Sequence, residues 1–266
     1  MLNVAVLGAS GRMGRTLVPL IASAPDLQLV GALAAAGDAA IGHDAGVLAG
    51  TVPLAVAITD DPARALEGAS VAIDFTLPAP SLEHARRCRE RSVPLVIGTT
   101  GHDEAARSEL ARIAESIPIV LAPNMSLGVN LLFKLAELAA RALDAGYDAE
   151  IYEAHHRHKV DAPSGTALGL GQAVARGRGT TLEQSALPPR HGTTGPRPAG
   201  GIGFAVVRGG DIVGDHRVIF AGPGERVELA HCAEDRSGFA RGALVAARWV
   251  AGRPPGLYSM LDVLGL

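Results

Sequence analysis

The chain contains few cysteines and no long apolar run, and each shortage excludes a class of protein. The two cysteines, Cys88 and Cys232, lie far apart and form no CxxC pair, which excludes a disulfide framework and a cysteine-rich zinc site. No apolar run reaches the roughly 18 residues needed to cross a bilayer. Met1 leads directly into a short apolar segment, without the basic region of a secretory leader. We therefore expect a cytoplasmic protein without a membrane span.

The chain also lacks an excess of basic charge and is poor in aromatic residues. It has 24 basic and 27 acidic side chains, so it offers no basic surface for nucleic acid or for an anionic membrane. Aromatic residues make up only 3% of the chain and 33 residues are glycine, which favours an α/β protein with many tight turns over an aromatic-rich β-sandwich. An apolar content of 48% in 266 residues is sufficient for the cores of roughly one to two domains.

The first half of the chain alternates between short apolar strands and helices. Residues 3–7 predict a strand, which is followed by a glycine turn and a helix that extends to about Ala24. Further helix starts are indicated at Asp60-Asp61-Pro62, Pro80-Ser81 and Asp103-Glu104. Strands that alternate with helices in this way predict a parallel, doubly wound sheet. The other strands predicted for this sheet are residues 27–33, 71–75, 95–97 and 119–121.

The alternation of short strands and helices ends after Asn124. Residues 128–145 predict one amphipathic helix, and Gly146 lies just past its end. A strand is predicted from Asp148 onward, and a helix over Ser164–Ala175 follows a polar loop.

The rest of the chain predicts a long loop, further strands and a final helix. Residues 176–201 are rich in Gly, Pro and Thr, and a loop of this length is typical of a lid or an assembly arm. Residues 239–250 predict a helix that could cap either domain, and we place the domain boundaries near Ser126 and near Arg236. The second domain is thus expected to contain a mixed or antiparallel sheet. Its antiparallel strands are predicted at residues 203–207, 211–221 and 226–232, joined by turns at 208–210 and 222–224.

Three glycines, Gly8, Gly11 and Gly14, follow the first predicted strand in a GxxGxxG pattern. Glycines permit a tight turn and close approach of the backbone, and the N-terminus of the next helix offers N–H groups to a pyrophosphate. Its place in an alternating β/α pattern favours dinucleotide binding over a purely structural turn. The candidate cofactor-binding residues of this loop are Gly8, Ala9, Ser10, Gly11, Arg12 and Met13.

The residues after the second predicted strand do not select between NADH and NADPH. An NAD-preferring site usually carries an acid about 20 residues beyond the glycine loop, where it binds the ribose 2′-hydroxyl. This chain has Ala34 and Ala35 there. Arg12 and Arg15 flank the loop and could meet a 2′-phosphate, which favours NADPH slightly, although solvent-facing helix arginines explain them equally well.

Two later strand ends carry further candidate cofactor-binding residues. Ligands of open α/β sheets bind at the carboxyl ends of the strands. Gly98-Thr99-Thr100-Gly101 and Ala122-Pro123-Asn124-Met125 both follow predicted strands. Each segment could form part of a ligand site or only a turn.

The run from Glu150 to Ala167 contains three of the nine histidines and one of the two lysines. A zinc site is one interpretation, but Arg157 and Lys159 would repel a cation and the spacing is not HExxH, so we expect no metal. A solvated basic loop is a second interpretation. An anionic substrate site explains best why a lysine occurs among 22 arginines, because an ammonium can change its protonation state and a guanidinium cannot. His155 or His156 would then act as general acid or base.

The same run contains a helix start. Ser164 follows Pro163 and is a natural N-cap. The backbone N–H groups of Gly165 and Thr166 would then begin a helix and form a seat for a carboxylate. Carboxylate binding and proton donation are thus predicted within one short stretch.

The run EAHHRHKVDAPSGTA, within residues 150–167, resembles the signature of the dihydrodipicolinate reductase (4-hydroxy-tetrahydrodipicolinate reductase) family. The resemblance covers nearly the whole chain, since other family motifs match in the same order. It implies NADPH- or NADH-dependent reduction of 4-hydroxy-tetrahydrodipicolinate, with loss of water, to tetrahydrodipicolinate in diaminopimelate and lysine biosynthesis. The other matching motifs are Gly8–Gly14, Asp74-Phe75-Thr76, Gly98–Gly101, Asn124 and residues 209–214.

The resemblance also implies a division of the chain. Residues 1–126 would bind the dinucleotide, and residues 127–235 would bind the dicarboxylate substrate and build a homotetramer. Residues 236–266 would form a C-terminal helix and tail that return to the first domain. Many members of the family have an acid where this chain has Ala34, so the resemblance leaves the choice between NADH and NADPH open.

The resemblance assigns roles residue by residue. His155 matches the proton donor or acceptor of the family, His156 a substrate contact, and Lys159 a proton donor at the substrate. Gly165 and Thr166, beside the N-cap Ser164, match residues that bind a substrate carboxylate. The residues that match the lining of the nicotinamide are Gly98, Thr99, Thr100, Ala122, Pro123, Asn124 and Met125.

Two other functions stay open at this point. A dehydrogenase of another amino-dicarboxylate, such as aspartate, would share the cofactor fold but leaves the helix start at Ser164 unexplained. A non-catalytic NAD(P)H sensor would keep the glycine loop but would not need His155 and Lys159. The presence of His155 and Lys159 in this chain argues against the sensor.

Overall fold

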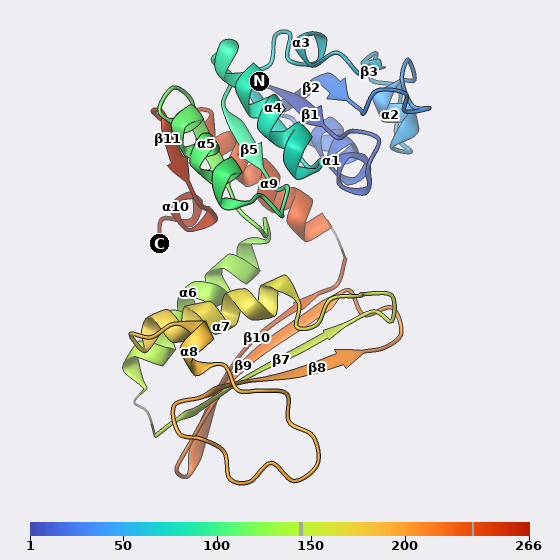
Figure 1. The fold of residues 1–266 in the computed structure, drawn as a ribbon. Coiled ribbons are helices and arrows are strands. Elements are labelled where there is room, and N and C mark those ends of the chain that lie inside the picture. Colours follow the sequence, from blue (N-terminus) through green and yellow to red (C-terminus); the bar gives the residue numbers. More distant parts are fainter. Residues whose placement is uncertain (144–145, 236) are drawn as a thin grey trace. The chain divides into compact units, whose positions relative to one another are not determined.

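The computed structural model describes residues 1–143, 146–235 and 237–266 (Figure 1). The chain forms two compact units: unit 1 comprises Met1–Leu127 and Ser237–Leu266, and unit 2 comprises the described residues of Gly128–Arg236. The first division falls beside Ser126, while the other boundary expected from the sequence, Arg236, lies outside the described residues. Within the described ranges, no helix combines the length and apolar character that a membrane span requires.

Unit 1 is built on a seven-stranded sheet in the order β11-β6-β5-β4-β1-β2-β3, in which every pairing is parallel. From β1 the chain adds β2 and β3 on one side and β4, β5 and β6 on the other, which is a doubly wound arrangement. The predicted Rossmann-type fold class is therefore confirmed. The strands are β1 (Leu2–Leu7), β2 (Leu27–Leu33), β3 (Ile58–Thr59), β4 (Val71–Asp74), β5 (Leu95–Ile97), β6 (Pro118–Leu121) and β11 (Gly256–Tyr258).

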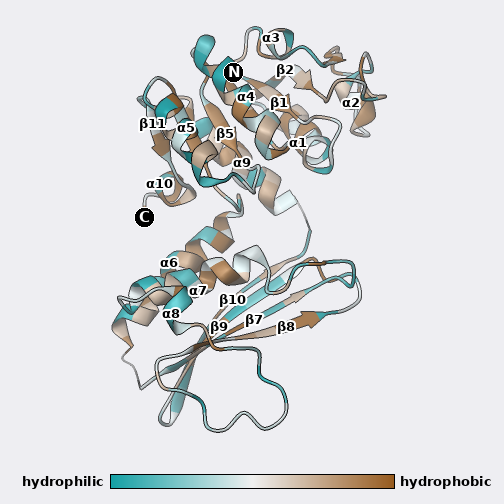
Figure 2. Ribbon diagram, viewed as in Figure 1, coloured by the Kyte–Doolittle hydropathy of each residue, from teal (hydrophilic) through white to brown (hydrophobic). Residues whose placement is uncertain are grey.

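Helices cover both faces of this sheet, and the strand sequences show why. Side chains alternate between the faces of a strand, so Val4 and Val6 of β1 enter one apolar cluster while Ala5 and Leu7 enter the other. α1 and α9 pack into the first cluster, and α4 and α5 into the second. Burial on both faces makes most residues of the central strands apolar (Figure 2). The helices of unit 1 are α1 (Arg12–Ser23), α2 (Ala45–Leu48), α3 (Pro62–Ala65), α4 (Pro78–Glu90), α5 (Glu104–Ala114), α9 (Ser237–Val250) and α10 (Met260–Leu264).

Several elements of unit 1 differ from the sequence prediction. α4 begins at Pro78, two residues before the expected Pro80-Ser81 start. Pro78 occupies the first position of the helix, where the missing N–H of a proline is tolerated. The short elements α2, β3, β11 and α10 were not predicted. The final helix α9 packs on the sheet of unit 1, and β11 extends that sheet by pairing with β6.

Unit 2 contains a four-stranded mixed sheet in the order β10-β9-β7-β8. The β7–β8 pair is parallel, and the other two pairs are antiparallel. Helices lie on one face of this sheet, where Ile151, Val218 and Phe220 pack against Leu132 and Leu170 (Figure 1). The elements of unit 2 are β7 (Asp148–His155), α7 (Gly165–Gly177), α8 (Leu182–Ser185), β8 (Ile202–Arg208), β9 (Gly214–Gly222) and β10 (Glu225–Ala233), with α6 (Leu127–Ala142) leading into it.

The strand pairing of unit 2 corrects one prediction. Residues 203–207 and 211–221 were expected to be antiparallel strands joined by a turn, but β7 lies between β8 and β9 and pairs with both. Residues 209–213 therefore carry the chain across β7, and β9 begins only at Gly214. The second predicted turn is confirmed, since Gly222 pairs with Glu225 across a two-residue loop.

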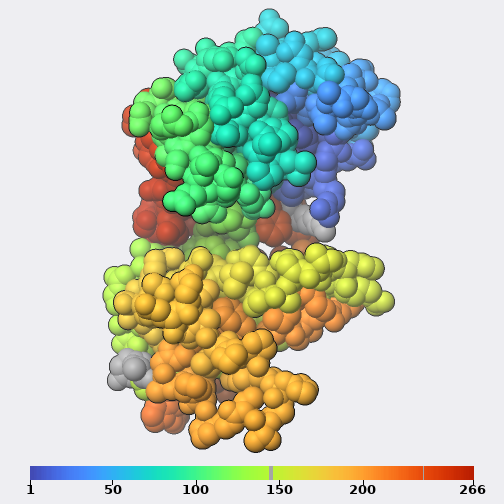
Figure 3. All heavy atoms as spheres, viewed as in Figure 1, coloured from blue at the N-terminus to red at the C-terminus, as the bar shows by residue number. Residues whose placement is uncertain are grey.

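The helices of unit 2 also differ at their ends from the prediction. α6 ends at Ala142, and the last two residues of its predicted range, 144 and 145, lie outside the described residues. α7 continues to Gly177 instead of ending at Ala175. The predicted long loop contains α8, and its residues 188–199 are mostly exposed on the surface of unit 2 (Figure 3).

Candidate functional site

The glycine loop connects β1 to α1 in a conformation that requires glycine. Gly8 has a φ of +89°, and a Cβ there would lie 2.6 Å from the carbonyl oxygen of Phe75. A Cβ at Gly14 would lie 2.3 Å from the carbonyl oxygen of Gly8. Both distances are shorter than real Cβ contacts, so the turn closes only with glycine at these positions.

α1 begins at Arg12 with Gly11 as its N-cap, and no side chain of the described residues caps it. An uncapped first turn directs N–H groups and the positive end of the helix dipole toward the loop. The Gly11 N–H donates to the Gly8 carbonyl oxygen at 3.1 Å, so the loop backbone lies close to this helix end. The residues present therefore fit the pyrophosphate of a dinucleotide.

An acid that the sequence analysis missed contacts this loop. The Ser10 hydroxyl donates to Asp38 Oδ2 at 2.6 Å, and the Ala40 N–H donates to Asp38 Oδ1 at 2.9 Å. These two hydrogen bonds hold the pKa of Asp38 below its ordinary value. Ala34 is buried, and its methyl side chain offers no polar group. Asp38 is the first acid after β2, a signal that the sequence contained, but it lies four residues beyond Ala34, where such an acid is expected.

The carboxyl ends of β4 and β5 are joined by a buried carboxylate. Asp74, the last residue of β4, is fully buried and accepts hydrogen bonds from the Thr99 hydroxyl at 2.7 Å and from His84 Nδ1 at 2.6 Å. The Thr76 hydroxyl also donates to it, at 2.8 Å. A Cβ at Gly98 would lie 2.1 Å from the Phe75 ring, so only glycine fits beside that ring. This network fixes the backbone of the predicted Gly98–Thr100 segment.

The predicted segment at the end of β6 lies beside the end of β5. The Ala122 N–H donates to the carbonyl oxygen of Ile97 at 3.2 Å. Asn124 Oδ1 accepts from the Ser126 N–H at 2.8 Å, while Met125 is buried. Because parallel strands end at the same edge, the structure brings the glycine loop and both later segments to one edge of the sheet of unit 1.

The predicted catalytic histidine lies in unit 2, at the end of β7. His155 Nδ1 is 2.6 Å from Oε2 of Glu153, two residues earlier on the same face of the strand. Arg208 binds the same carboxylate through both of its oxygens, at 2.7 and 2.8 Å. The Ser164 N–H donates to Glu153 Oε1 at 2.9 Å. Four groups from β7, β8 and the start of α7 thus converge within unit 2.

The electrostatics of this cluster follow from its burial. Burial raises the pKa of Glu153, but the hydrogen bonds from Arg208, His155 and the Ser164 N–H outweigh that effect and leave the pKa below its ordinary value. Burial, with the neighbouring His155, lowers the pKa of His216 to about 4. The cluster therefore pairs an ionised carboxylate with a neutral His216 at neutral pH.

The predicted carboxylate seat is a capped helix start. Ser164 is the N-cap of α7, and its hydroxyl accepts from the Ala167 N–H at 3.2 Å. His216 Nε2 lies 3.2 Å from the same hydroxyl, and the rings of His155 and His216 are in edge-to-face contact. Gly165 and Thr166 form the first turn, at the positive end of the helix dipole. The structure thus brings the predicted residues His155 and Ser164 together through Glu153 and His216.

Lys159 and His156 lie in the loop between β7 and α7. Lys159 Nζ pairs with Asp161 Oδ1 at 2.8 Å, a partner that the sequence analysis missed. This pairing holds the pKa of Asp161 below its ordinary value. The His156 ring lies beside His158, with 6.3 Å between the ring centroids. Among the described residues, no group of three or more His, Cys, Asp or Glu side chains is placed to bind a metal.

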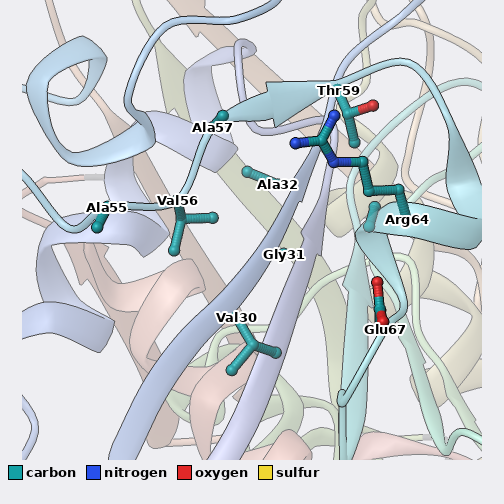
Figure 4. Close-up of a pocket in the computed structure, with 10 residues that line it drawn as sticks. Val30, Gly31, Ala32, Ala55, Val56, Ala57, Thr59, Arg64 and Glu67 are labelled. Carbon is teal, nitrogen blue, oxygen red and sulfur yellow. The ribbon is translucent and has the colours of Figure 1, made fainter.

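A separate pocket of about 300 Å³ lies at the edge of the unit 1 sheet, between β2 and the segments around β3 and α3 (Figure 4). It contains none of the site residues predicted from the sequence. Its charged side chains, Arg64 and Glu67, come from α3 and the turn after it. The lining residues are Val30, Gly31, Ala32, Ala55, Val56, Ala57, Thr59, Arg64, Ala65 and Glu67.

A doubly wound sheet with a glycine loop, joined in one chain to a unit that carries a histidine, a lysine and a helix start, defines the class of dinucleotide-dependent oxidoreductases. Two family models match the chain: "Dihydrodipicolinate reductase, N-terminus" over residues 2–125 and "Dihydrodipicolinate reductase, C-terminus" over residues 128–264. The chain belongs to the dihydrodipicolinate reductase family.

Curated relatives and solved structures agree with this membership. The chain is 58% identical to the 4-hydroxy-tetrahydrodipicolinate reductase of Thiobacillus denitrificans, over 99% of this chain and 98% of the relative. It is 54% identical to that of Nitrosospira multiformis, over 100% of this chain and 98% of the relative. A dipicolinate-bound dihydrodipicolinate reductase from Paenisporosarcina sp. TG-14 matches with a TM-score of 0.79 and 27% identity, over 98% of both chains. Aspartate dehydrogenase from Thermotoga maritima shares the fold alone, with a TM-score of 0.51 and 11% identity over 96% of this chain and 98% of that chain.

Proposed function

We propose that the chain reduces 4-hydroxy-tetrahydrodipicolinate to tetrahydrodipicolinate, with loss of water, at the expense of NADPH or NADH. The reaction belongs to diaminopimelate and lysine biosynthesis. The observation that carries the proposal is the 58% identity, over 99% of the chain, to a relative that bears this name. The cluster around His155 and Ser164 supports it, because it joins a proton-transfer group to a seat for a carboxylate.

Unit 1 holds the cofactor in this proposal. The first turn of α1 and the glycine loop bind the pyrophosphate through backbone N–H groups. The bound cofactor supplies the hydride. The buried Asp74 keeps the segment at Thr99 in the conformation that receives the nicotinamide end. The residues assigned to the cofactor are Gly8, Ala9, Ser10, Gly11, Arg12, Met13, Gly98, Thr99, Thr100, Ala122, Pro123, Asn124 and Met125.

Unit 2 holds the substrate. The start of α7, at Ser164, Gly165 and Thr166, binds one carboxylate with the helix dipole, and Lys159 and His156 contact the substrate. Hydride addition leaves an electron pair on the substrate, and a proton from Lys159 or His155 neutralises it. His155 Nε2 is the ring atom that exchanges this proton, because Nδ1 is engaged by Glu153.

We also assign the chain to the cytoplasm and to a homotetramer built by unit 2. Residues 127–235 form the substrate and assembly domain, residues 1–126 the cofactor domain, and residues 236–266 the tail that completes the cofactor domain. Three features support the assembly. The helices of unit 2 occupy one face of its sheet, which leaves the other face without helices in the described part of the chain, and strand β10 has mostly exposed residues. Arg197 binds Glu150 and Asp148 and thereby anchors the exposed loop at residues 188–199.

The test is oxidation of NADPH and NADH by the purified protein, with the substrate generated in situ from pyruvate and aspartate semialdehyde by the preceding synthase. We expect substrate-dependent oxidation of at least one cofactor. Aspartate with the oxidised cofactors is the control for an amino-dicarboxylate dehydrogenase. Cofactor binding without oxidation in the synthase-coupled assay would overturn the proposed reaction, and reduction of cofactor by aspartate would replace it with the dehydrogenase.

A further inference from the structure

Glu153 is a fully buried carboxylate at the centre of the unit 2 site. Burial of a charge is unfavourable unless that charge is paired and hydrogen-bonded. Glu153 receives four hydrogen bonds: two from the Arg208 guanidinium, one from His155 and one from the Ser164 N–H. A single structural ion pair with Arg208 would need only the first two.

The contact with His155 determines which ring nitrogen carries the proton. An ionised carboxylate accepts hydrogen bonds and does not donate them. At 2.6 Å from Oε2, His155 Nδ1 must therefore carry the hydrogen, which leaves Nε2 as the nitrogen that gains or loses a proton. Glu153 thus selects the tautomer of His155.

The contact with Ser164 connects the same carboxylate to the helix start. Oε1 accepts the backbone N–H of Ser164, whose hydroxyl caps α7 at Ala167. The position of Glu153 therefore sets both the orientation of the His155 ring and the first turn of α7. One residue fixes the geometry between the proton-transfer group and the carboxylate seat.

We propose that Glu153 is a positioning residue, which orients His155 for proton transfer and sets the helix start that receives the substrate carboxylate. This inference rests on the proposed reductase function. Removal of the carboxylate charge should disturb catalysis through His155 more than it disturbs the fold.

The test is Glu153→Gln, compared with Glu137→Gln on α6. Glu137 pairs with Arg141 and Arg176, outside the Glu153 cluster, so its variant should retain the parental rate. For Glu153→Gln we expect kcat to fall by roughly 10² and KM to rise several-fold, since both the tautomer and the seat are affected. Glu153→Asp keeps the charge and should recover part of the rate.

Two further readouts separate positioning from a merely structural role. The ¹⁵N spectrum of His155 should show Nδ1 protonated in the parent and a mixture of tautomers in Glu153→Gln. The pH–rate profile should also change, because the substitution removes the anion that contacts the His155 ring. The other charged or titratable groups that face the cluster are Arg208 of β8, His216 of β9, His231 of β10, and Lys159 and Asp161 of the loop before α7.

An unchanged tautomer, kcat and pH profile in Glu153→Gln would overturn the inference. If Glu153→Gln does not fold, Glu153→Asp provides the test, because its shorter side chain withdraws the carboxylate from His155 Nδ1. A parental tautomer of His155 and a parental rate in Glu153→Asp would then contradict the positioning role of Glu153. The tautomer is measured without turnover. If the parent protein shows no reductase activity, the proposed function is refuted. The effect of Glu153 on the His155 tautomer can still be tested.

In unit 1, the contact of Asp38 with the glycine loop supports a second, independent inference, which concerns the choice between NADH and NADPH. Its carboxylate contacts the glycine loop at Ser10, while Arg15, a candidate for the 2′-phosphate, donates through Nε to the Ser10 carbonyl at 2.9 Å. A carboxylate beside the glycine loop binds ribose hydroxyls and repels a 2′-phosphate. We infer that Asp38 takes the role of the acid that is missing at Ala34 and makes the chain prefer NADH, contrary to the slight preference for NADPH indicated by the arginines.

The test is direct binding of NADH and NADPH, measured by calorimetry without substrate. The parent should bind NADH more tightly, and Asp38→Asn should shift the ratio of the two dissociation constants toward NADPH by about 10-fold, the discrimination expected from one charge contact. Glu115→Gln removes an equal charge at the end of α5 and should leave the ratio unchanged. A parent that prefers NADPH, or a ratio that Asp38→Asn does not alter, would overturn this inference, whatever the outcome for the reductase reaction.

Discussion

Lys159 and Asp161 form an ion pair within the loop between β7 and α7, with 2.8 Å between Nζ and Oδ1. The lysine side chain is 21% exposed and the aspartate side chain 54%. The ammonium is thus held by a partner that faces solvent and can be exchanged for a ligand carboxylate at small cost. This arrangement suits a lysine that contacts a dicarboxylate and also donates a proton.

The first prediction concerns the two proton-transfer candidates. Lys159→Ala and His155→Ala should each lower kcat by roughly 10² to 10⁴, because each removes a group that delivers a proton. Dissociation constants for NADH and NADPH should stay unchanged, since the glycine loop belongs to unit 1. Lys134→Ala, which alters the other lysine of the chain, is the control. Parental turnover in either variant would contradict the assigned role.

The second prediction concerns the pH dependence of stability through His216. Its pKa is lowered from 6.5 to about 4 in the folded protein, chiefly by burial. The unfolded chain therefore binds a proton first, and stability present above pH 6.5 is lost as the pH falls toward 4. The loss from this residue is on the order of 2–3 kcal/mol.

Urea unfolding of the parent and of His216→Asn at pH 7 and pH 4.5 checks this effect. The variant should lose less stability between the two pH values than the parent does. His191→Asn changes an exposed histidine and serves as the control. Equal losses in the parent and in His216→Asn would show that His216 does not titrate as its burial requires.

Much of unit 1 could be predicted because its central strands are buried on both faces. β5 and most of β1 and β2 therefore read as apolar runs with turn residues at their ends. β11 could not be predicted, since it has only three residues and Leu257 is 44% exposed. It becomes a strand by pairing with β6, a contact that no local pattern encodes.

The candidate site shows the same division between local and distant information. The N-cap at Ser164 is a local signal, and the structure bears it out. The Glu153–His155 contact was also accessible, because residues two apart share a face of a strand, yet it was missed. The pairing of Glu153 with Arg208, 55 residues away, requires the parallel register of β7 and β8, which the sequence prediction did not contain.

The third prediction concerns Gly14. Gly14→Ala places a methyl group 2.3 Å from the Gly8 carbonyl oxygen, so the loop must shift. Affinity for both NADH and NADPH should fall by about 10-fold or more, because the backbone N–H groups that face the pyrophosphate move with the loop. Gly252→Ala introduces a methyl group into open space and serves as the control. Calorimetric titration decides, and unchanged affinity in Gly14→Ala would show that the loop does not hold the cofactor.

The fourth prediction concerns Asp74, whose buried carboxylate holds Thr99 and His84. Asp74→Ala leaves these donors without their acceptor in the core, which should lower the free energy of unfolding by about 3–5 kcal/mol. The freed segment at Thr99 should also weaken cofactor binding at temperatures where the variant is still folded. Asp60→Ala, at an exposed acid after β3, should alter neither property.

Asp74→Asn distinguishes the two effects of Asp74. Asparagine keeps one of the two acceptor oxygens, so stability should recover in part. Thr99 binds Oδ1 and His84 binds Oδ2, so one of these two side chains would face the amide NH₂ group instead of an oxygen. Thermal unfolding and NADH titration of the two variants measure this separation. Full retention of stability in Asp74→Ala would mean that the carboxylate does not hold the ends of β4 and β5 together. If Asp74→Ala loses stability but keeps the parental NADH affinity, then Asp74 stabilises only the core. The Thr99 segment would in that case not belong to the cofactor site.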